Sequence, residues 1–345
     1  QGLVRANFGN PALQWEVGKK FDFGMDASFL QERLSITADI FRNTTEKMIT
    51  QDAAPTASGL LYSVANNGGM QTNGVELSVN ARIINKDRLK WDVGFNIATY
   101  RNKITKLPGN SMQTQYAGAT ILTQVGLPAG MFYGYKTNGV YTSNAEAASA
   151  GISVRNSKGD LVPQQGGDLR FVDVNNDKII DTKDMQVIGN PNPDYTGGIT
   201  TGVTYDRVTV SALFTFSHGN SLYNYTRREI ESESSAQNQS LAILNRWRAD
   251  GQVTAVPRAS YGDPSGNSSF SDRWIEDGSY LRLRTLSVSY DVPFKYKFFK
   301  YVKIYATGNN LLTFTRYLGY DPEFAANENI LLQGIDTTLE PQFRT

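Results

Sequence analysis

The sequence contains no cysteine and only one histidine, His218. Without cysteine there are no disulfide frameworks, thiol nucleophiles or iron–sulfur clusters, and a single histidine excludes His-rich zinc sites. Ser–His–Asp catalysis would depend on His218 alone, and no catalytic motif surrounds it in Thr215-Phe216-Ser217-His218-Gly219. We therefore interpret His218 as a lone surface histidine.

The sequence also lacks a run of 18 apolar residues and an excess of charge of either sign. The first absence excludes a transmembrane helix but leaves a membrane β-barrel open, because barrel strands alternate lipid-facing and lumen-facing residues. The net charge of +1 gives no indication of nucleic-acid binding or of electrostatic docking on anionic lipid. Hydrophobic residues make up 40% of the chain, while 31 Gly, 18 Tyr and 17 Phe suit many strands and turns.

Residues 71–101 show the main pattern of the chain, which is strict alternation of apolar and polar side chains around the short polar turn 86–88. Such period-two alternation predicts a β-hairpin, here with strands about twice the usual globular length. The apolar faces of the two strands are Val75/Leu77/Val79/Ala81 and Leu89/Trp91/Val93/Phe95.

Three further hairpins are expected, around turns at 31–33, 206–207 and 294–299. Every connection at the other end of the strands is long: 55–70, 107–194, 229–277 and 317–345. Short turns on one side and long loops on the other are typical of outer-membrane barrels, whose short turns are periplasmic. Eight strands of this length leave open edges unless other strands complete the barrel. The predicted fold is therefore all-β: about eight antiparallel transmembrane strands of a larger barrel, with long extracellular loops.

The predicted loop 107–194 contains an acidic stretch, 173–184, with EF-hand-like spacing. Oxygen-bearing side chains stand at positions 1, 3, 5, 9 and 12, and position 7 offers a backbone carbonyl. The candidate ligands are Asp173, Asn175, Asp177, Ile179, Asp181 and Asp184. Lys178 replaces the usual glycine and Asp184 the usual Glu, so we expect weak binding of Ca²⁺, or of Mg²⁺, in a structural role. A metal-free loop of Asx turns is the alternative.

The predicted loop 229–277 lacks strand alternation, and Leu241, Leu244 and Trp247 are spaced as on a helix. We expect a short amphipathic helix whose apolar side chains pack within the loop rather than against a partner.

Eight segments, in this order and over nearly the whole chain, resemble the SusC/RagA-type TonB-dependent transporters of the Bacteroidetes outer membrane. They are 10–16 (NPALQWE), 132–139 (FYGYKTNG), 167–177 (GDLRFVDVNND), 188–195 (IGNPNPDY), 244–247 (LNRW), 274–283 (WIEDGSYLRL), 308–315 (GNNLLTFT) and 319–323 (GYDPE). The resemblance implies a 22-stranded barrel with an internal plug, of which residues 1–345 are the C-terminal part. Because Gln1 is not a natural start and the plug, the N-terminal strands and the last strand are missing, we expect a piece of a larger transporter.

The resemblance also implies partners and cargo. A SusD-like lipoprotein would cover the extracellular loops, TonB would act through the missing N-terminal part, and lipid or lipopolysaccharide would surround the wall. The cargo would be an oligosaccharide or an oligopeptide. Aromatic rings in the loops could stack on sugar rings, although we favour loop packing or interfacial anchoring for each of them. These substrate-binding candidates are Tyr133, Tyr135, Trp247 and Trp274.

Two other function classes remain in view. A secreted or surface β-protein, stabilised by calcium and binding glycans without a membrane, would place the apolar strand faces in a closed core. A glycoside hydrolase needs a pair of carboxylates, and no Asp/Glu pair stands out from the loop and lumen charges. We therefore expect nutrient import across the bacterial outer membrane, and no enzymatic activity.

Overall fold

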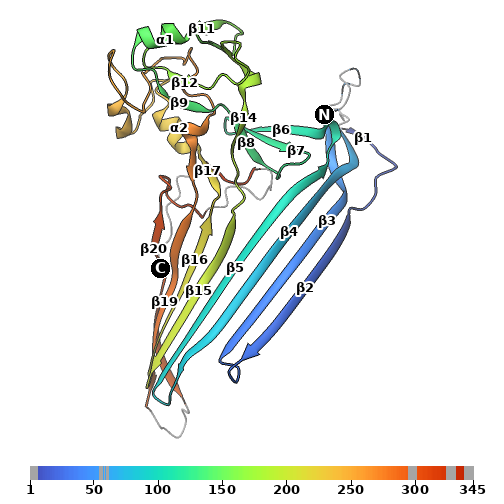
Figure 1. Ribbon diagram of the computed structural model, residues 1–345, viewed down its shortest axis with the longest axis vertical. Helices are drawn as coiled ribbons and strands as arrows, with labels where there is room; N and C mark the ends of the chain where they lie inside the picture. Colours follow the sequence, from blue (N-terminus) through green and yellow to red (C-terminus); the bar gives the residue numbers. More distant parts are fainter. Residues whose placement is uncertain are drawn as a thin grey trace, which may run out of the picture.

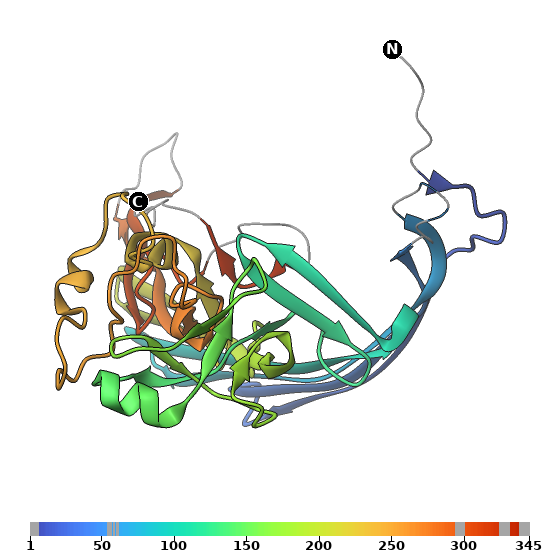
Figure 2. The same cartoon turned by 90° about the horizontal axis from the view of Figure 1, so that it is seen from above.

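The computed structural model describes residues 7–53, 57, 59, 62–293, 301–323 and 332–337. Its main feature is a curved antiparallel sheet of eight long strands, paired in the order in which they occur in the chain (Figures 1 and 2). The strands are β2 (Val17–Phe29), β3 (Leu34–Ala53), β4 (Tyr62–Asn85), β5 (Leu89–Lys106), β15 (Tyr195–Tyr205), β16 (Val208–His218), β19 (Tyr280–Val292) and β20 (Val302–Thr315). The eight strands predicted from alternation are confirmed. A short β1 (Asn7–Phe8) adds to β4 in parallel.

The boundaries of two predicted connections differ from the sequence prediction. The connection predicted at 229–277 spans 219–279, because β16 ends at His218 and β19 begins at Tyr280. Residues 62–70, expected in a loop because of their Gly and Asn content, extend β4 and pair with β3. Two glycines make this pairing possible. A Cβ on Gly68 would lie 2.9 Å from Cβ of Met48, and one on Gly69 would lie 2.7 Å from Oγ1 of Thr105. The glycines therefore allow close strand packing here, instead of breaking the strand.

The register of the sheet carries one apolar face across all eight strands. A single row, for example, contains Ala27, Ile36, Val79, Phe95, Ile199, Phe214, Leu283 and Leu312. The next row on the opposite face contains Asp26, Thr37, Ser78, Asn96, Gly198 and Thr215. The predicted separation of an apolar face from a polar face is therefore continuous, and it extends far beyond the first hairpin.

The apolar face has the height of a membrane band. On β5 it runs from Thr99 to Leu89, about ten residues or ~33 Å of strand. A tilt of about 40° reduces this to ~25 Å, the height of the lipid-facing band in outer-membrane barrels. Trp91, Tyr205 and Tyr290 lie on this face close to the short turns, as expected for an aromatic girdle.

The short turns and the long connections lie at opposite ends of the strands, as predicted (Figure 1). Turns at 30–33, 86–88 and 206–207 join the hairpins at one end. The fourth expected turn, 294–299, lies outside the described residues. The connections 107–194 and 219–279 build a layer above the other end, mainly over β15 to β20.

The region 107–194, in which the sequence shows no sustained alternation, is densely structured. It holds β6 (Ser111–Tyr116), β7 (Ala119–Gln124), β8 (Met131–Gly134), β9 (Thr137–Val140), β10 (Ser153–Arg155), β11 (Leu161–Pro163), β12 (Leu169–Phe171), β13 (Ile179–Ile180), β14 (Gln186–Gly189), the helix α1 (Asn144–Ala150) and 3-10 turns at Pro108–Asn110 and Thr182–Asp184. Strands of only two to six residues are too short for periodicity to reveal them.

The second connection contributes β17 (Ser221–Asn224), α2 (Tyr225–Glu231), 3-10 turns at Leu241–Asn245 and Asp272–Trp274, and β18 (Ile275–Asp277). The tail adds β21 (Ile335–Asp336), which pairs with β17. The helix expected near 241–247 is thus a short 3-10 turn. Within the described ranges, no helix has the length and hydropathy needed to cross a bilayer.

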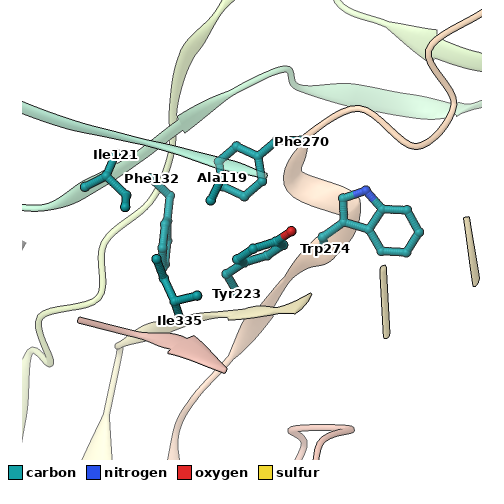
Figure 3. Packing of buried hydrophobic residues seen from close by; sticks show 7 residues of the cluster. All are labelled: Ala119, Ile121, Phe132, Tyr223, Phe270, Trp274 and Ile335. Atoms are coloured by element: carbon teal, nitrogen blue, oxygen red, sulfur yellow. The ribbon is translucent and has the colours of Figure 1, made fainter. Parts of the chain in front are cut away.

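The buried core belongs to the loop layer. Ala119, Ile121, Phe132, Tyr223, Phe270, Trp274 and Ile335 form its main cluster (Figure 3). Phe270 packs edge to face on Tyr223 at 4.9 Å and on Phe132 at 6.2 Å between ring centroids. A second cluster contains Val140, Val154, Leu169, Phe171 and Ile180. The first cluster combines both long connections, and Trp247 of the second connection packs against the second cluster, so the two connections form one packed layer.

Candidate functional site

The first half of the acidic loop 173–184 is bent around its own side chains. The Lys178 amide donates to Oδ2 of Asp173 at 2.8 Å, and the Asp177 amide to Oδ1 of Asn175 at 2.9 Å. Lys178, at the position usually held by glycine, has a φ of 63°, so the chain makes the sharp turn in spite of the side chain. Among the described residues, the buried Oδ1 of Asp173 has no hydrogen-bond partner. An orphaned carboxylate oxygen at position 1 fits a hard cation.

The second half of the loop uses its carboxylates to close the turn. The buried Asp184 accepts hydrogen bonds from the amides of Val174 and Asp181, both at 2.9 Å. Asp181 caps the 3-10 turn at Thr182–Asp184 and lies 3.6 Å from the Arg155 guanidinium. Across the described residues, no three His, Cys, Asp or Glu side chains are grouped closely enough to hold a metal. Both carboxylate oxygens of Asp177 accept hydrogen bonds, from Nδ2 of Asn175 and from the Ile179 amide, each within the loop. A cation site at Asp173, Asn175 and Asp177, with the Ile179 carbonyl next in the loop, stays a prediction.

Tyr135 lines a cavity of about 510 Å³ in the loop layer. Its ring packs edge to face on Phe171, 5.5 Å between centroids. Its amide and carbonyl are held by Phe270 and Asp272. Burial raises the pKa of the Tyr135 hydroxyl, and the carboxylates of Asp181 and Asp184 raise it further. The hydroxyl therefore stays protonated and can donate a hydrogen bond to a ligand.

The charged groups of this cavity are mostly cationic. Arg155, Lys158 and Arg228 line it together with one carboxyl, that of Asp263. Arg228 is fixed by donating from Nε to the Ser268 carbonyl at 2.9 Å. Burial raises the pKa of Asp263, while hydrogen bonds from Ser268 and Asn267 act in the opposite direction. An aromatic ring beside fixed polar groups is suited to binding a polar oligomer.

The other three aromatic candidates have different positions. Trp274 is 0% exposed, and its Nε1 donates to the Ser269 carbonyl at 3.1 Å. Trp274 is a core residue, and no face of its ring is free to stack on a sugar. Trp247 donates from Nε1 to the Thr142 carbonyl at 3.0 Å and packs against the second core cluster. Tyr133 is half-buried on β8 and, unlike Tyr135, does not line the cavity.

The helical spacing of Leu241, Leu244 and Trp247 predicted packing within the loop. This holds for Trp247 only. Leu241 is 83% exposed and Leu244 59% exposed, and nearby Val253 is 86% exposed. In a 3-10 turn, residues three apart lie on one face, and here that face of Leu241 and Leu244 is turned to solvent. The layer therefore carries an apolar tip, which we define as Leu241, Leu244 and Val253.

Sequence reasoning missed two buried charged side chains, Asp168 in the loop layer and Arg282 on β19, and the ion pairs that they make. Asp168 accepts from Nε of Arg258 at 2.7 Å and from Nδ2 of Asn267 at 3.0 Å. Arg282 is nearly fully buried and pairs with Asp321 and Glu323. Asp168, Arg282, Asp321 and Glu323 lie in motif segments and Arg258 lies outside them, but the pairing of these residues across the fold left no pattern in the sequence.

His218 lies at the end of β16 and is exposed, as expected for a lone surface histidine. Its ring stacks on Tyr195 at 4.8 Å between centroids.

Comparison with known proteins identifies the family. Residues 2–311 match the family described as TonB dependent receptor-like, beta-barrel. The chain belongs to this family. TonB-dependent receptor P3 of Formosa agariphila is 32% identical over all of this chain and 35% of its own length. TonB-dependent receptor SusC of Bacteroides thetaiotaomicron is 27% identical over 97% of this chain and 32% of its own.

A solved structure described as the RagAB peptide importer in a closed-closed state is similar, with a TM-score of 0.77 and 25% identity. The similarity covers 97% of this chain and 35% of that one. The chain thus spans about a third of the length of its relatives. As in other TonB-dependent receptor barrels, its eight strands are a segment of an outer-membrane wall. The alternative of a secreted, non-membrane β-protein is wrong, because the apolar faces belong to a membrane barrel rather than to a closed core.

Proposed function

We propose that this chain is the C-terminal part of an outer-membrane importer of oligomeric nutrients, either oligosaccharides or oligopeptides. The observation that carries the proposal is the combination of a lipid-height apolar wall with a packed layer of long loops at one end of its strands. A wall alone requires only short connections. Long loops that form a folded layer on a rigid scaffold are typical of a surface that binds cargo.

This chain would supply wall and extracellular loops, with no catalytic role. Its sequence relatives are receptors by name, and a similar solved structure is described as a peptide importer. Gating would depend on the rest of the transporter, meaning the plug, the N-terminal part of the barrel and TonB acting through the N-terminal part.

A SusD-like lipoprotein is the proposed partner on the outer side. The apolar tip supports this, because exposed Leu241, Leu244 and Val253 on a loop layer gain stability when a partner covers them. The cavity beside Tyr135 is the proposed contact with cargo held beneath such a lid, since it combines an aromatic ring with fixed cations.

The acidic loop is proposed to take Ca²⁺, or Mg²⁺, as a structural ion. Asp173, Asn175 and Asp177 with the Ile179 carbonyl would hold it, and Asp181 and Asp184 would keep the loop closed around it. Its contribution would be rigidity of the layer next to the Tyr135 cavity, whose lining includes Arg155 and Ile180.

The decisive experiment uses cells that produce the intact transporter. Deleting the transporter should abolish uptake of one class of labelled oligomer while leaving uptake of its monomers unchanged. Tyr135→Ala should lower uptake of that oligomer, and Tyr133→Ala, outside the cavity, should lower it much less. Leu241→Asp/Leu244→Asp should reduce co-purification of a lipoprotein, whereas Leu30→Asp at the opposite end of the strands should not. Unchanged oligomer uptake after deletion would overturn the proposal.

A further inference from the structure

Two adjacent rows at the loop-side edge of the apolar face are rich in basic side chains. The first row contains Phe21, Arg42, Asn73 and Arg101, and the second contains Lys19, Thr44, Gln71 and Lys103. We call Lys19, Arg42, Arg101 and Lys103, with the amides of Gln71 and Asn73 between them, the basic rim. All four cationic side chains are exposed. The near-zero net charge of the whole chain conceals this local excess.

The charges of the basic rim are only partly neutralised. Lys19 pairs with Glu46 at 2.6 Å and Arg101 with Asp194 at 2.8 Å. Arg42 donates to Oε1 of Gln71 at 2.7 Å, and Lys103 makes no ion pair within the described ranges. Two acids thus face four bases within the described residues. The two cations without an acid, Arg42 on β3 and Lys103 on β5, lie on either side of β4, whose Gln71 and Asn73 side chains stand between them. Each strand is about 4.8 Å from the next.

The place of the basic rim restricts what can bind there. The next row towards the short turns is Phe23, Ile40, Val75 and Thr99, the first row of the apolar band. A molecule held by the cations would therefore have lipid chains below it and water above it. A soluble anion has no apolar part to place against the lipid chains, whereas a lipid with an anionic headgroup has an apolar part for the bilayer and a charged part for the water.

We propose that the basic rim binds the phosphate-bearing headgroup of an outer-leaflet lipid, whose acyl chains lie along Phe23, Ile40 and Val75. Arginine guanidinium groups pair with phosphate oxygens through two parallel hydrogen bonds, and Gln71 and Asn73 add amide donors. The inference rests on the proposed orientation, with the long loops outside the cell. Its function would be to fix the height and the lipid shell of the wall where β3 to β5 leave the bilayer.

The test measures lipid binding to the intact, detergent-solubilised transporter by native mass spectrometry. The probes are bisphosphorylated lipid A and the same lipid after removal of its phosphates. The variant Arg42→Gln/Lys103→Gln breaks no ion pair within the described residues and leaves the Arg101–Asp194 pair in place. It should bind the bisphosphorylated lipid about 30-fold more weakly, since each basic residue at a membrane surface contributes a roughly fivefold factor.

The matched control is Lys86→Gln/Arg88→Gln at the short-turn end, which should bind like the unmodified protein. Arg42→Lys/Lys103→Arg keeps the charges and should restore binding, which separates loss of charge from loss of folding. Three outcomes would overturn the inference. The two lipids could bind equally well, the control variant could lose as much binding as Arg42→Gln/Lys103→Gln, or the charge-retaining variant could fail to restore binding. Oligomer uptake by Arg42→Gln/Lys103→Gln cells should persist, so the outcome is independent of the proposed transport function.

Discussion

Arg258 donates a hydrogen bond from Nε to Oδ1 of Asp168 at 2.7 Å, and Asp168 is fully buried. The partners come from the two different long connections, 90 residues apart in the chain. The Asn267 side chain and the Arg258 guanidinium both converge on the same carboxylate. One buried acid therefore ties the two halves of the loop layer together. The neighbouring Gly167 has a φ of 86°, and a Cβ there would clash with Cε3 of Trp247, so the position requires glycine.

Removing this carboxylate should loosen the layer without opening the wall. Asp168→Ala leaves Arg258 and Asn267 without their shared acceptor, at an expected cost of about 3–5 kcal/mol. Hydrogen exchange in the intact protein should then be faster in β12 and unchanged in β4. The matched control is Glu46→Ala, which removes the exposed pair with Lys19 and should cost roughly 1 kcal/mol or less. Equal exchange in both variants would contradict a joining role for Asp168.

The two faces of the wall should respond very differently to charge. Val93 lies on the apolar face and Asn96 on the polar face of the same strand, β5. Val93→Arg should destabilise the barrel by an expected ~2–4 kcal/mol near mid-membrane, because only that arginine meets lipid. Asn96→Arg should have a much smaller effect. Urea unfolding of the intact transporter in detergent or lipid measures both, and equal effects would show that the faces are assigned wrongly.

The wall could be predicted from sequence because each long strand repeats one signal many times. Alternation in β4 and β5 fixes which side chains share a face, and the short turns fix the register. The prediction failed at residues 62–70. There the local Gly and Asn content favours a loop, whereas the space occupied by Met48 and Thr105 of the neighbouring strands requires small residues in a strand. That requirement is visible only once the strands are paired.

The loop layer could not be predicted in the same way, because its stability depends on contacts between distant residues. Thr137 is held by Asp272, and Leu169 by Asn267. Aromatic candidates illustrate the consequence. Tyr135 and Trp274 were chosen on the same grounds, yet one lines a cavity and the other is buried at 0% exposure. Residue type indicates what a side chain can bind, but burial decides whether it is available.

The orientation of the wall can be tested on intact cells. Protease added outside should cut within 107–194 or 229–277, where exposed segments such as the apolar tip offer access. The short turns at 86–88 and 206–207 should be spared, although they are equally exposed in the structure. Mass spectrometry of the released peptides identifies the sites. Cleavage at the turns alone would mean that the long loops face the periplasm.

Alkaline pH should destabilise the loop layer through Tyr223. Burial raises the pKa of its hydroxyl to about 12, from an ordinary value of 10.0. Tyrosinate therefore forms first in the unfolded chain. The stabilisation is complete below pH 10 and is lost as pH rises towards 12, by about 3 kcal/mol.

Tyr223→Phe should remove the pH dependence that Tyr223 causes. The variant also lacks the hydrogen bond from the Tyr223 hydroxyl to the Ala117 carbonyl, so it should be less stable than the unmodified protein at neutral pH. Hydrogen exchange of β17 between pH 8 and 12, corrected for the intrinsic rate, measures the difference. Tyr261→Phe is the control, because the Tyr261 side chain is 85% exposed. A Tyr223→Phe profile that keeps the full alkaline loss would assign the effect to another group.

Calcium should bind to the first half of the acidic loop. Asp173 offers an oxygen without a partner, and its other oxygen already accepts from the Lys178 amide, so Asp173→Ala and Asp177→Ala should each abolish calcium uptake measured by calorimetry on the intact protein. Asp160→Ala, in the neighbouring turn outside the 173–184 spacing, is the matched control and should leave uptake unchanged. Because Lys178 and Asp184 replace the usual glycine and Glu, affinity should be weak, and raising ionic strength should weaken it further. Chelation should also increase hydrogen exchange at Ile179 and Ile180, which pair with β10. No uptake that depends on Asp173 and Asp177 would mean that the loop is held by its Asx turns alone.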